Sequence, residues 1–162
     1  LSGINPLGSL AMGVAMAVAD FASHTRLWIA EQEFGPDFKI EHIPHAVSEG
    51  IDIINIRNSL VICDFVPEGL ESLARVLNAA TGFEHTGESL KKIGEKITDL
   101  ARRYNLRNGR KHMDDILPDR FFNETSLAGF MRGKKLDRDL FNELVGQYYK
   151  LKGWNQKGEP QN

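Results

Sequence analysis

The stretch TGESLKKIGEKITDLARRY, residues 86–104, decides the fold class because its apolar residues recur every three or four positions. Thr86 stands just before the run as a candidate helix cap, and lysines and glutamates occupy the opposite face. This spacing predicts an amphipathic α-helix that packs one side against a core. The residues expected on the packed side are Leu90, Ile93, Ile97, Leu100, Ala101 and Tyr104.

Similar spacing predicts further helices in the rest of the chain. They are expected over residues 6–18, 51–65, 67–81 and 138–151. Asn5 and Asp137 are the expected caps of the first and last of these helices, and Gly82 is expected to end the third. The small side chains of residues 10–19 fit a helix packed on all sides, or one that a bound group approaches closely. We favour the packed helix.

A loop is expected over residues 34–49, where a Gly-Pro pair and Pro44 interrupt the helical spacing. The run IDIINI, residues 51–56, is compatible with a strand as well as with a helix. Strand and hairpin signals are otherwise nearly absent. The chain is therefore expected to be all-α, as a single helical region over residues 1–162, without internal repeats.

The composition excludes several classes of protein. Of 162 residues, 41% are hydrophobic and 26% charged, and the net charge of −2 gives no attraction to nucleic acid or anionic lipid. The longest apolar run, residues 10–19, is too short to span a bilayer. A single cysteine rules out an internal disulfide framework and suits a reducing compartment. We therefore expect a cytoplasmic protein with neither a nucleic-acid nor a membrane partner.

Two groups of residues have a possible binding chemistry and a simpler explanation. His42 and His45 would hold zinc only with two further ligands, and Pro44 interrupts their spacing, so histidines that bind nothing are preferred. The run ARRYNLRNGRKHMDD, residues 101–115, gathers basic residues around Tyr104 and could contact phosphates. Two aspartates end the run, and a helix end whose cations lie against the helix dipole is the preferred interpretation.

The C-terminal third carries two longer patterns, LRNGRKHMDDILPDRFFNE at 106–124 and LDRDLFNELVGQYYKLKGWNQKGEP at 136–160. They resemble the C-terminal end of the tungsten-containing aldehyde ferredoxin oxidoreductase family, which carries D-D-x-L-P-x-R-F and then Y-Y-x-L-R-G-W-D-x-x-G-x-P. Lys152 replaces the arginine of that pattern, and Asn155 replaces its aspartate. The resemblance implies a multihelical C-terminal region of a larger enzyme, and a start at Leu1 without methionine agrees with it.

Within this resemblance, NSLVIC at residues 58–63 is similar to the family motif D-x-x-G-L-C. In the family, the aspartate and the backbone after it contact a tungstopterin, and the cysteine is the fourth ligand of a [4Fe–4S] cluster. The resemblance implies that Cys63 is a metal ligand. It places Asn58, Ile62 and Asp64 beside the pterin. Taken without the resemblance, a lone cysteine in an apolar run is more often a small core side chain.

A weaker match concerns the N-terminal part, where NPLG at residues 5–8 resembles the family's D-P-R-G. The ungapped helix that follows sets AVADFASHT against A-T-S-x-R-G-x-x-H, whose histidine is thought to act as an acid near the metal. His24 lies one residue before that position, which Thr25 occupies, and Phe21 replaces the arginine. We take His24 as the catalytic candidate. The offset means either a different local register or a branch with other chemistry, such as the tungsten benzoyl-coenzyme A reductases.

The resemblance implies a C-terminal fragment of a tungstopterin and [4Fe–4S] oxidoreductase that oxidises aldehydes to carboxylic acids, with ferredoxin as electron acceptor. The N-terminal pterin-binding domain and the family's C-x-x-C-x-x-x-C cysteines are absent from this sequence. The fragment is therefore expected to be inactive and free of cofactor alone, with the N-terminal part as its partner and a homo-oligomer as the intact enzyme. The alternatives are the benzoyl-coenzyme A reductase branch, a non-catalytic helical binding module, and a zinc domain using His42 and His45.

Overall fold

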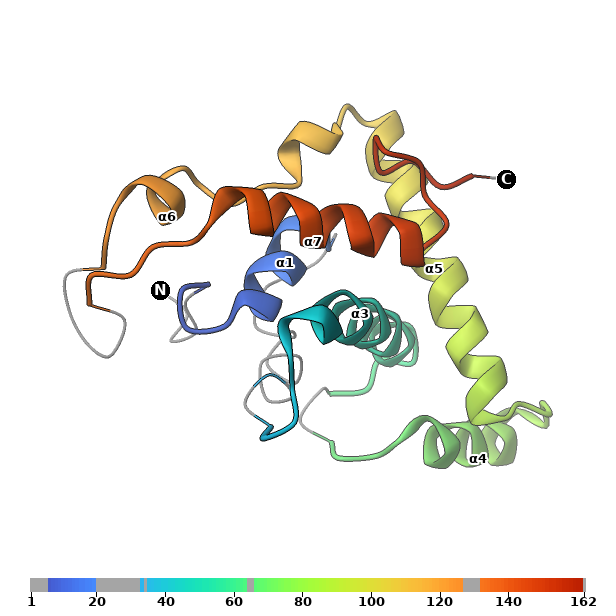
Figure 1. Ribbon diagram of the computed structural model, residues 1–162. Helices are drawn as coiled ribbons and strands as arrows, with labels where there is room; N and C mark the ends of the chain where they lie inside the picture. Colours follow the sequence, from blue (N-terminus) through green and yellow to red (C-terminus); the bar gives the residue numbers. More distant parts are fainter. Residues whose placement is uncertain (1–5, 20–32, 34, 64–65, 127–131, 162) are drawn as a thin grey trace.

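The computed structural model describes residues 6–19, 33, 35–63, 66–126 and 132–161 of the chain. Within them the fold consists of helices and connecting turns, with no strand, which confirms the expected all-α class (Figure 1). Two short 3-10 turns, η2 (Ile40–His42) and η3 (His112–Asp114), accompany the α-helices. The α-helices are α1 (Leu10–Val18), α3 (Ile43–Ser59), α4 (Leu70–Thr81), α5 (Gly87–Arg107), α6 (Arg120–Asn123) and α7 (Arg138–Leu151).

Helix α3 is the central element, because α1, α5 and α7 all pack against it. In Figure 1, α7 crosses in front of α1, while α5 runs diagonally away and meets α4 at its far end. The larger core lies between α1, α3 and α7, and a smaller core around Ile56 and Leu90 lies between α3, α4 and α5. None of the helices in the described part of the chain is long and apolar enough to cross a bilayer.

Helix α1 begins at Leu10, so the predicted start at Pro6 is wrong; the expected cap, Asn5, lies outside the described residues. The hydroxyl of Ser9 accepts a 3.1 Å hydrogen bond from an N–H of the first turn. The Glu33 carboxylate accepts two more, both 3.0 Å long. These acceptors satisfy the free N–H groups of the helix end and fix its start. Seven of its nine residues are buried, which confirms the helix packed on all sides.

Helix α3 begins at Ile43, so the loop predicted to extend to residue 49 is wrong. Pro44 lies in the first turn, where the N–H that proline lacks would have no partner in the helix. Residues 51–56 are helical, which excludes the strand alternative. The helix ends at Ser59, six residues before the predicted end at position 65.

The ends of the other helices follow their capping residues. Helix α4 begins at Leu70, three residues after the predicted start at Pro67, and ends at Thr81 with Gly82 as its C-cap, as predicted. That glycine has a φ of 76°, which side chains disfavour. Thr86 caps α5, and Asp137 caps α7 by accepting from two N–H groups of its first turn, so both predicted caps are confirmed.

The buried side of α5 agrees with the predicted one only in part: Leu90 is buried, and Ile93 and Ile97 pack against the smaller core. Leu100 and Tyr104, expected to pack inward, are 68% and 66% exposed. The buried side also carries small and polar residues, because α3 approaches closely along it. A Cβ atom at Gly94 would lie 2.5 Å from the carbonyl oxygen of Asp52 on α3. The buried residues are Gly87, Leu90, Gly94, Thr98 and Arg102.

Replacing Gly94 by alanine should therefore destabilise the chain by about 1–3 kcal/mol, because the backbone of α3 has to move away. Gly146 on α7 is the matched control, since a Cβ atom added there would meet nothing within 4 Å. Gly146→Ala should leave stability unchanged or raise it by up to about 1 kcal/mol through better helix propensity. Urea unfolding of both variants measures this. Equal effects of the two substitutions would contradict the close contact.

Candidate functional site

Residues 58–63, the motif segment, begin in the last turn of α3 and leave the helix through a tight turn. The N–H of Ile62 donates to the carbonyl of Arg57 at 2.9 Å, and the N–H of Val61 donates to that of Asn58 at 3.1 Å. This pair of bonds is the Schellman arrangement that often ends a helix. It fixes the main chain that leads to Cys63.

Val61 occupies the left-handed position of this turn, with a φ of 56°. It is the one non-glycine residue with positive φ in the described part of the chain. A left-handed conformation costs a side chain about 1–2 kcal/mol, and glycine escapes that cost. The left-handed backbone at this position thus explains why the family motif has glycine there. The Val61 side chain is 92% exposed, so no packing offsets the strain.

The side chains of the motif segment face different surroundings. Cys63 is exposed, so its interpretation as a small core side chain is wrong. Asn58 is also exposed, and Ile62 is half-buried against the smaller core. The structure therefore brings Asn58 and Cys63 to the surface at one helix end. His24 and Asp64 lie outside the described residues.

Restoring glycine at this position tests the strain. Val61→Gly should raise the free energy of unfolding by about 1 kcal/mol, because the relief of the left-handed strain exceeds the entropy that glycine adds to the unfolded chain. The exposed valine side chain contributes little burial that could be lost. Chemical denaturation of the variant and the wild type gives the difference. A destabilised variant would show that Val61 is not strained.

A group of buried polar contacts converges on Asp115, which is buried at the end of η3. Arg102, fully buried on α5, places its Nη1 and Nη2 3.0 and 2.5 Å from the two carboxylate oxygens. Arg110 donates to the same carboxylate at 2.6 and 3.0 Å, and the Tyr149 hydroxyl donates to it from α7. We call these four residues the Asp115 cluster. Burial, followed by the neighbouring carboxylate, raises the pKa of Tyr149, which therefore stays protonated.

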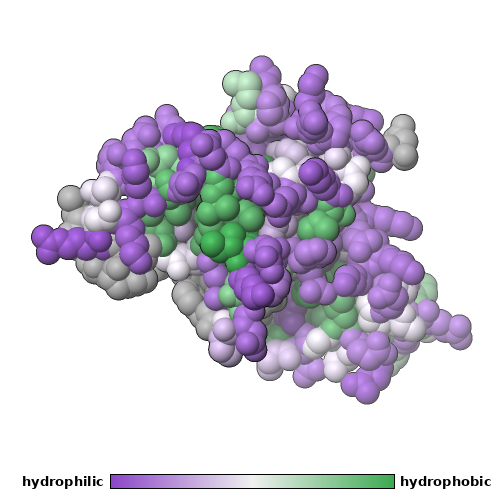
Figure 2. Space-filling view, in the orientation of Figure 1, coloured by the Kyte–Doolittle hydropathy of each residue, from purple (hydrophilic) through white to green (hydrophobic). Residues whose placement is uncertain are grey.

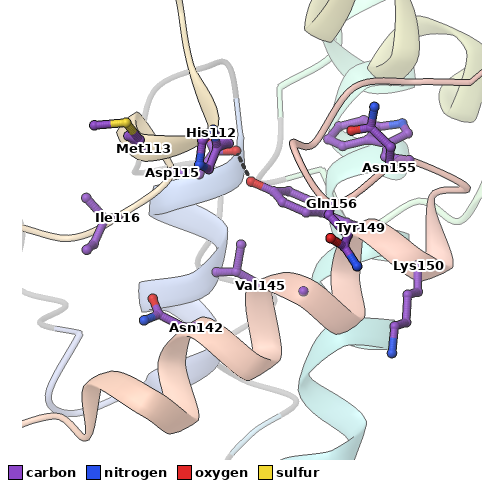
Figure 3. A pocket seen from close by; sticks show the side chains of 12 residues that line it. His112, Met113, Asp115, Ile116, Asn142, Val145, Tyr149, Lys150, Asn155 and Gln156 are labelled. Carbon is purple, nitrogen blue, oxygen red and sulfur yellow. Dashed lines mark hydrogen bonds between the residues drawn. The ribbon is translucent and has the colours of Figure 1, made fainter.

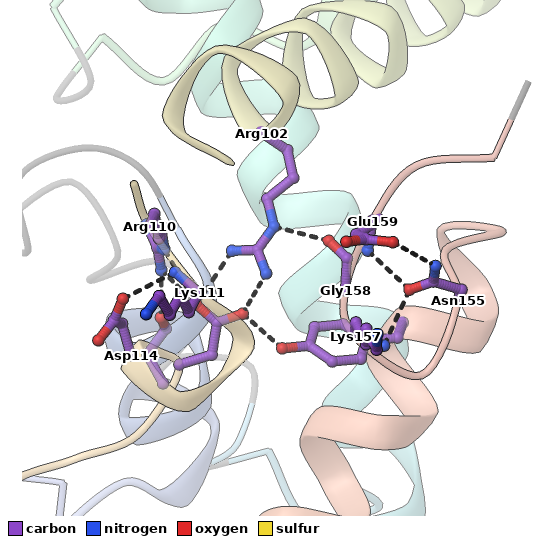
Figure 4. A network of polar contacts seen from close by, with 11 residues as sticks. Arg102, Arg110, Lys111, Asp114, Asn155, Lys157, Gly158 and Glu159 are labelled. Atoms are coloured by element: carbon purple, nitrogen blue, oxygen red, sulfur yellow. Dashed lines mark hydrogen bonds and ion pairs between the residues drawn. The ribbon is translucent and has the colours of Figure 1, made fainter. Parts of the chain in front are cut away.

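The Asp115 cluster also holds parts of the chain that lie outside it. Arg102 Nε donates to the carbonyl of Gly158 at 2.8 Å (Figure 4), and Arg110 Nη2 donates to that of Ala17 at 2.7 Å. A Cβ atom at Gly158 would overlap Arg102 Nη2 and the Tyr149 ring, so only glycine fits there. The basic run is thus partly internal, in place of the expected cations at a helix end: two of its arginines neutralise a buried aspartate.

A second buried ion pair joins α3 to the end of α7. Lys152 Nζ lies 2.8 and 3.0 Å from the two carboxylate oxygens of Asp52, and both side chains are at most 5% exposed. Thr98 on α5 donates to the same carboxylate at 2.5 Å and accepts from Asn55 at 2.8 Å. Burial raises the pKa of Asp52, and the Lys152 ammonium opposes that rise only in part. The lysine that replaces the family's arginine therefore has a structural partner.

The raised pKa of Asp52 predicts the pH dependence of stability. The folded state binds this proton more tightly than the unfolded chain, so the favourable contribution is complete below the usual pKa of 3.8 and is lost as pH rises through the raised value. The free energy of unfolding of the wild type should thus fall relative to that of Asp52→Asn as the pH rises above about 4. Urea titrations across this range measure the difference. A difference that grows with pH would show that attraction to Lys152 outweighs burial.

A groove of about 530 Å³ lies beside the Asp115 cluster, between α7, η3 and residues 152–161, the C-terminal segment (Figure 3). Val145, Asn142 and Lys150 of α7 line it, together with Met113 and Ile116 from the turn around η3. Figure 2 shows apolar side chains emerging in the middle of the face that carries α7, framed by hydrophilic ones. Asp115 and Tyr149, on its wall, already hydrogen-bond to each other. Cys63 does not line this groove, so the groove and the motif segment are separate features.

The described residues contain no group of three or more His, Cys, Asp or Glu side chains that could hold a metal ion. His42 and His45 are both exposed, and His42 Nδ1 accepts from the N–H of Lys39 at 3.2 Å. The exposed thiol of Cys63, on a main chain held by hydrogen bonds, could serve as one ligand of a metal centre shared with another part of the protein. Such a centre requires further ligands from outside the described residues.

Comparison with known proteins gives a match over the whole chain. Residues 1–162 match the sequence model of the family described as "Aldehyde ferredoxin oxidoreductase, domains 2 & 3". The tungsten-containing aldehyde ferredoxin oxidoreductase of Pyrococcus furiosus is 32% identical over 142 residues, which are 81% of this chain and 23% of that protein. The chain thus spans about a quarter of the length of this curated relative.

Two further similarities were found, one to a protein sequence and one to a solved structure. The WOR-like subunit of an aliphatic sulfonate oxidoreductase from Pyrococcus furiosus is 36% identical over 110 residues, covering 64% of this chain and 18% of that protein. The solved active-site complex BamBC of benzoyl coenzyme A reductase, in complex with 1,5-dienoyl-CoA, aligns with a TM-score of 0.63 and 24% identity. It covers 79% of this chain and 19% of that one. At that identity the likeness concerns the fold.

Proposed function

Because the chain belongs to the aldehyde ferredoxin oxidoreductase family, we propose that it is the C-terminal helical part of a tungsten-containing oxidoreductase that oxidises aldehydes to carboxylic acids. The observation that carries this proposal is the match over all 162 residues to a family whose curated relatives are about four times longer. In the proposal the N-terminal part of the same enzyme is the partner, ferredoxin accepts the electrons, and the intact enzyme is a homo-oligomer.

In this proposal Cys63 is one thiolate ligand of a [4Fe–4S] cluster. Thiolates hold such clusters, and a four-iron cubane needs more ligands than one cysteine supplies. The exposure of Cys63 supports the role, because a ligand to a centre shared with another part of the protein has to lie on the surface. The hydrogen bonds of the helix end fix the main chain before the thiol, so little further ordering is needed when the cluster binds.

The other proposed contacts of the motif segment concern the tungstopterin, which would supply the two-electron chemistry at tungsten. The exposed amide of Asn58 offers both a donor and an acceptor, but lacks the charge of the family's aspartate. Ile62 would form an apolar wall beside the cofactor. Asp64 would lie next to the pterin, and His24 is the proposed catalytic residue. The task of these residues is to bind and orient the cofactor and to exclude water from it.

A second candidate is a non-catalytic helical module that kept the scaffold. The strain at Val61 favours it, since a motif under selection for cofactor binding would retain the unstrained glycine. A third candidate is an enzyme of this family that acts on another substrate. The names of the sulfonate oxidoreductase subunit and of the benzoyl-coenzyme A reductase complex point to substrates other than aldehydes, and the offset of His24 agrees with a different chemistry.

The substitution Cys63→Ala tests the proposal in the full-length enzyme. Iron content and the electron paramagnetic resonance signal of the reduced cluster should fall to a small fraction of the wild-type values, because a ligand is lost. Val61→Gly is the matched control, since it changes a neighbouring motif position and keeps the thiol.

An unchanged cluster signal in Cys63→Ala would overturn the assignment of the ligand. The native protein should also be larger than the 18.2 kDa of this chain and contain tungsten and iron. A native protein of 18.2 kDa without either metal would favour the non-catalytic module.

A further inference from the structure

Arg57 lies in the last turn of α3 and is only 9% exposed. Its guanidinium donates to backbone carbonyls on the segment that follows the helix. The distances are 2.7 Å to Val66, 2.5 Å to Glu68 and 3.5 Å to Cys63. The carbonyl of Arg57 itself accepts from the N–H of Ile62 at 2.9 Å. One residue thus holds the main chain on both sides of Cys63.

We infer that Arg57 is the positioning residue for the Cys63 thiol, an inference that rests on the proposed function of that thiol as a cluster ligand. The described residues between α3 and α4 belong to no regular element, so their carbonyl groups lack helical donors. A guanidinium offers five N–H donors in a rigid fork and satisfies several carbonyls at once. Arg57 therefore supplies the order that a helix would otherwise give to this segment.

Geometry separates this role from a general structural one. Arg57 Nη1 and the N–H of Val66 both donate to the carbonyl of Cys63, at 3.5 and 3.0 Å. These contacts fix the peptide unit that carries the thiol, whereas α5 and α7 are held by the Asp115 cluster and by Lys152. Loss of the guanidinium should therefore loosen the thiol and leave the helices in place. Neither the resemblance nor the sequence pattern assigns a role to this arginine.

The first test is amide hydrogen exchange on the native protein, for Arg57→Met and Arg57→Lys. Exchange over residues 60–63 and 66–68 should accelerate about tenfold in Arg57→Met, the change expected for the loss of a hydrogen bond, while exchange in α5 stays at the wild-type rate. Lysine keeps the charge but cannot serve three carbonyls, so Arg57→Lys should lie between the two. The matched control is Arg75→Met, which removes an exposed arginine whose Nη2 donates to Ser72 within α4.

Wild-type exchange in Arg57→Met would overturn the positioning role. So would an equal acceleration in all helices, which would indicate general stability. If Arg57→Met does not fold, the local exchange of Arg57→Lys decides the question in the same way.

The second test measures iron content and the midpoint potential of the cluster in the full-length enzyme. In Arg57→Met the potential should shift or iron should be lost, because the ligand and its exposure to solvent change. Cys63→Ala separates the two proposals. If Cys63→Ala keeps its iron, the assignment of Cys63 as a cluster ligand fails and takes this inference with it, whatever the exchange result. If Cys63→Ala loses iron while Arg57→Met keeps wild-type iron and potential, only the role of Arg57 is overturned.

Discussion

The burial of Asp115 is the constraint on which the C-terminal half of the fold depends. A carboxylate inside a protein is costly unless donors surround it, and here Arg102, Arg110 and Tyr149 provide them. These donors lie on α5, on the turn after it and on α7, so the three elements cannot shift independently. The family-like patterns at 106–124 and 136–160 contain three of the four residues of the Asp115 cluster, which gives them an architectural role.

The C-terminal end of α3 carries the candidate metal ligand. At the end of α3, the one thiol of the chain is exposed on a segment whose main chain is fixed by the helix end and by Arg57. A free cysteine is among the most buried residue types, so an exposed one on an ordered segment points to its reactivity as the reason for its place. The proposed function gives that reason a chemical form, since it makes Cys63 a ligand of an iron–sulfur cluster.

The helices could be predicted from the sequence because apolar spacing and capping residues such as Thr86 and Asp137 act locally. The buried side of α5 could be predicted only in part. Leu90, Ile93 and Ile97 pack as their spacing predicts, but Gly94 lets α3 approach closely, and the buried hydrogen bonds of Thr98 form beside that contact. The Asp115 cluster joins distant positions, which periodicity does not report. The motif segment could be recognised only through its resemblance to the family. The role of Arg57 could have been suspected because a charged residue lies within the apolar run of α3.

The sequence separations within and around the Asp115 cluster have a consequence for how the chain folds. Its contacts join residues that are 13, 34 and 56 positions apart. A partly formed cluster would leave a desolvated guanidinium or carboxylate without its partner. The cluster therefore stabilises the fold little until all of its segments are in contact. Contacts of such long range are slow to close. We therefore expect α5, η3, α7 and the C-terminal segment to form one cooperative folding unit, assembled late and lost together.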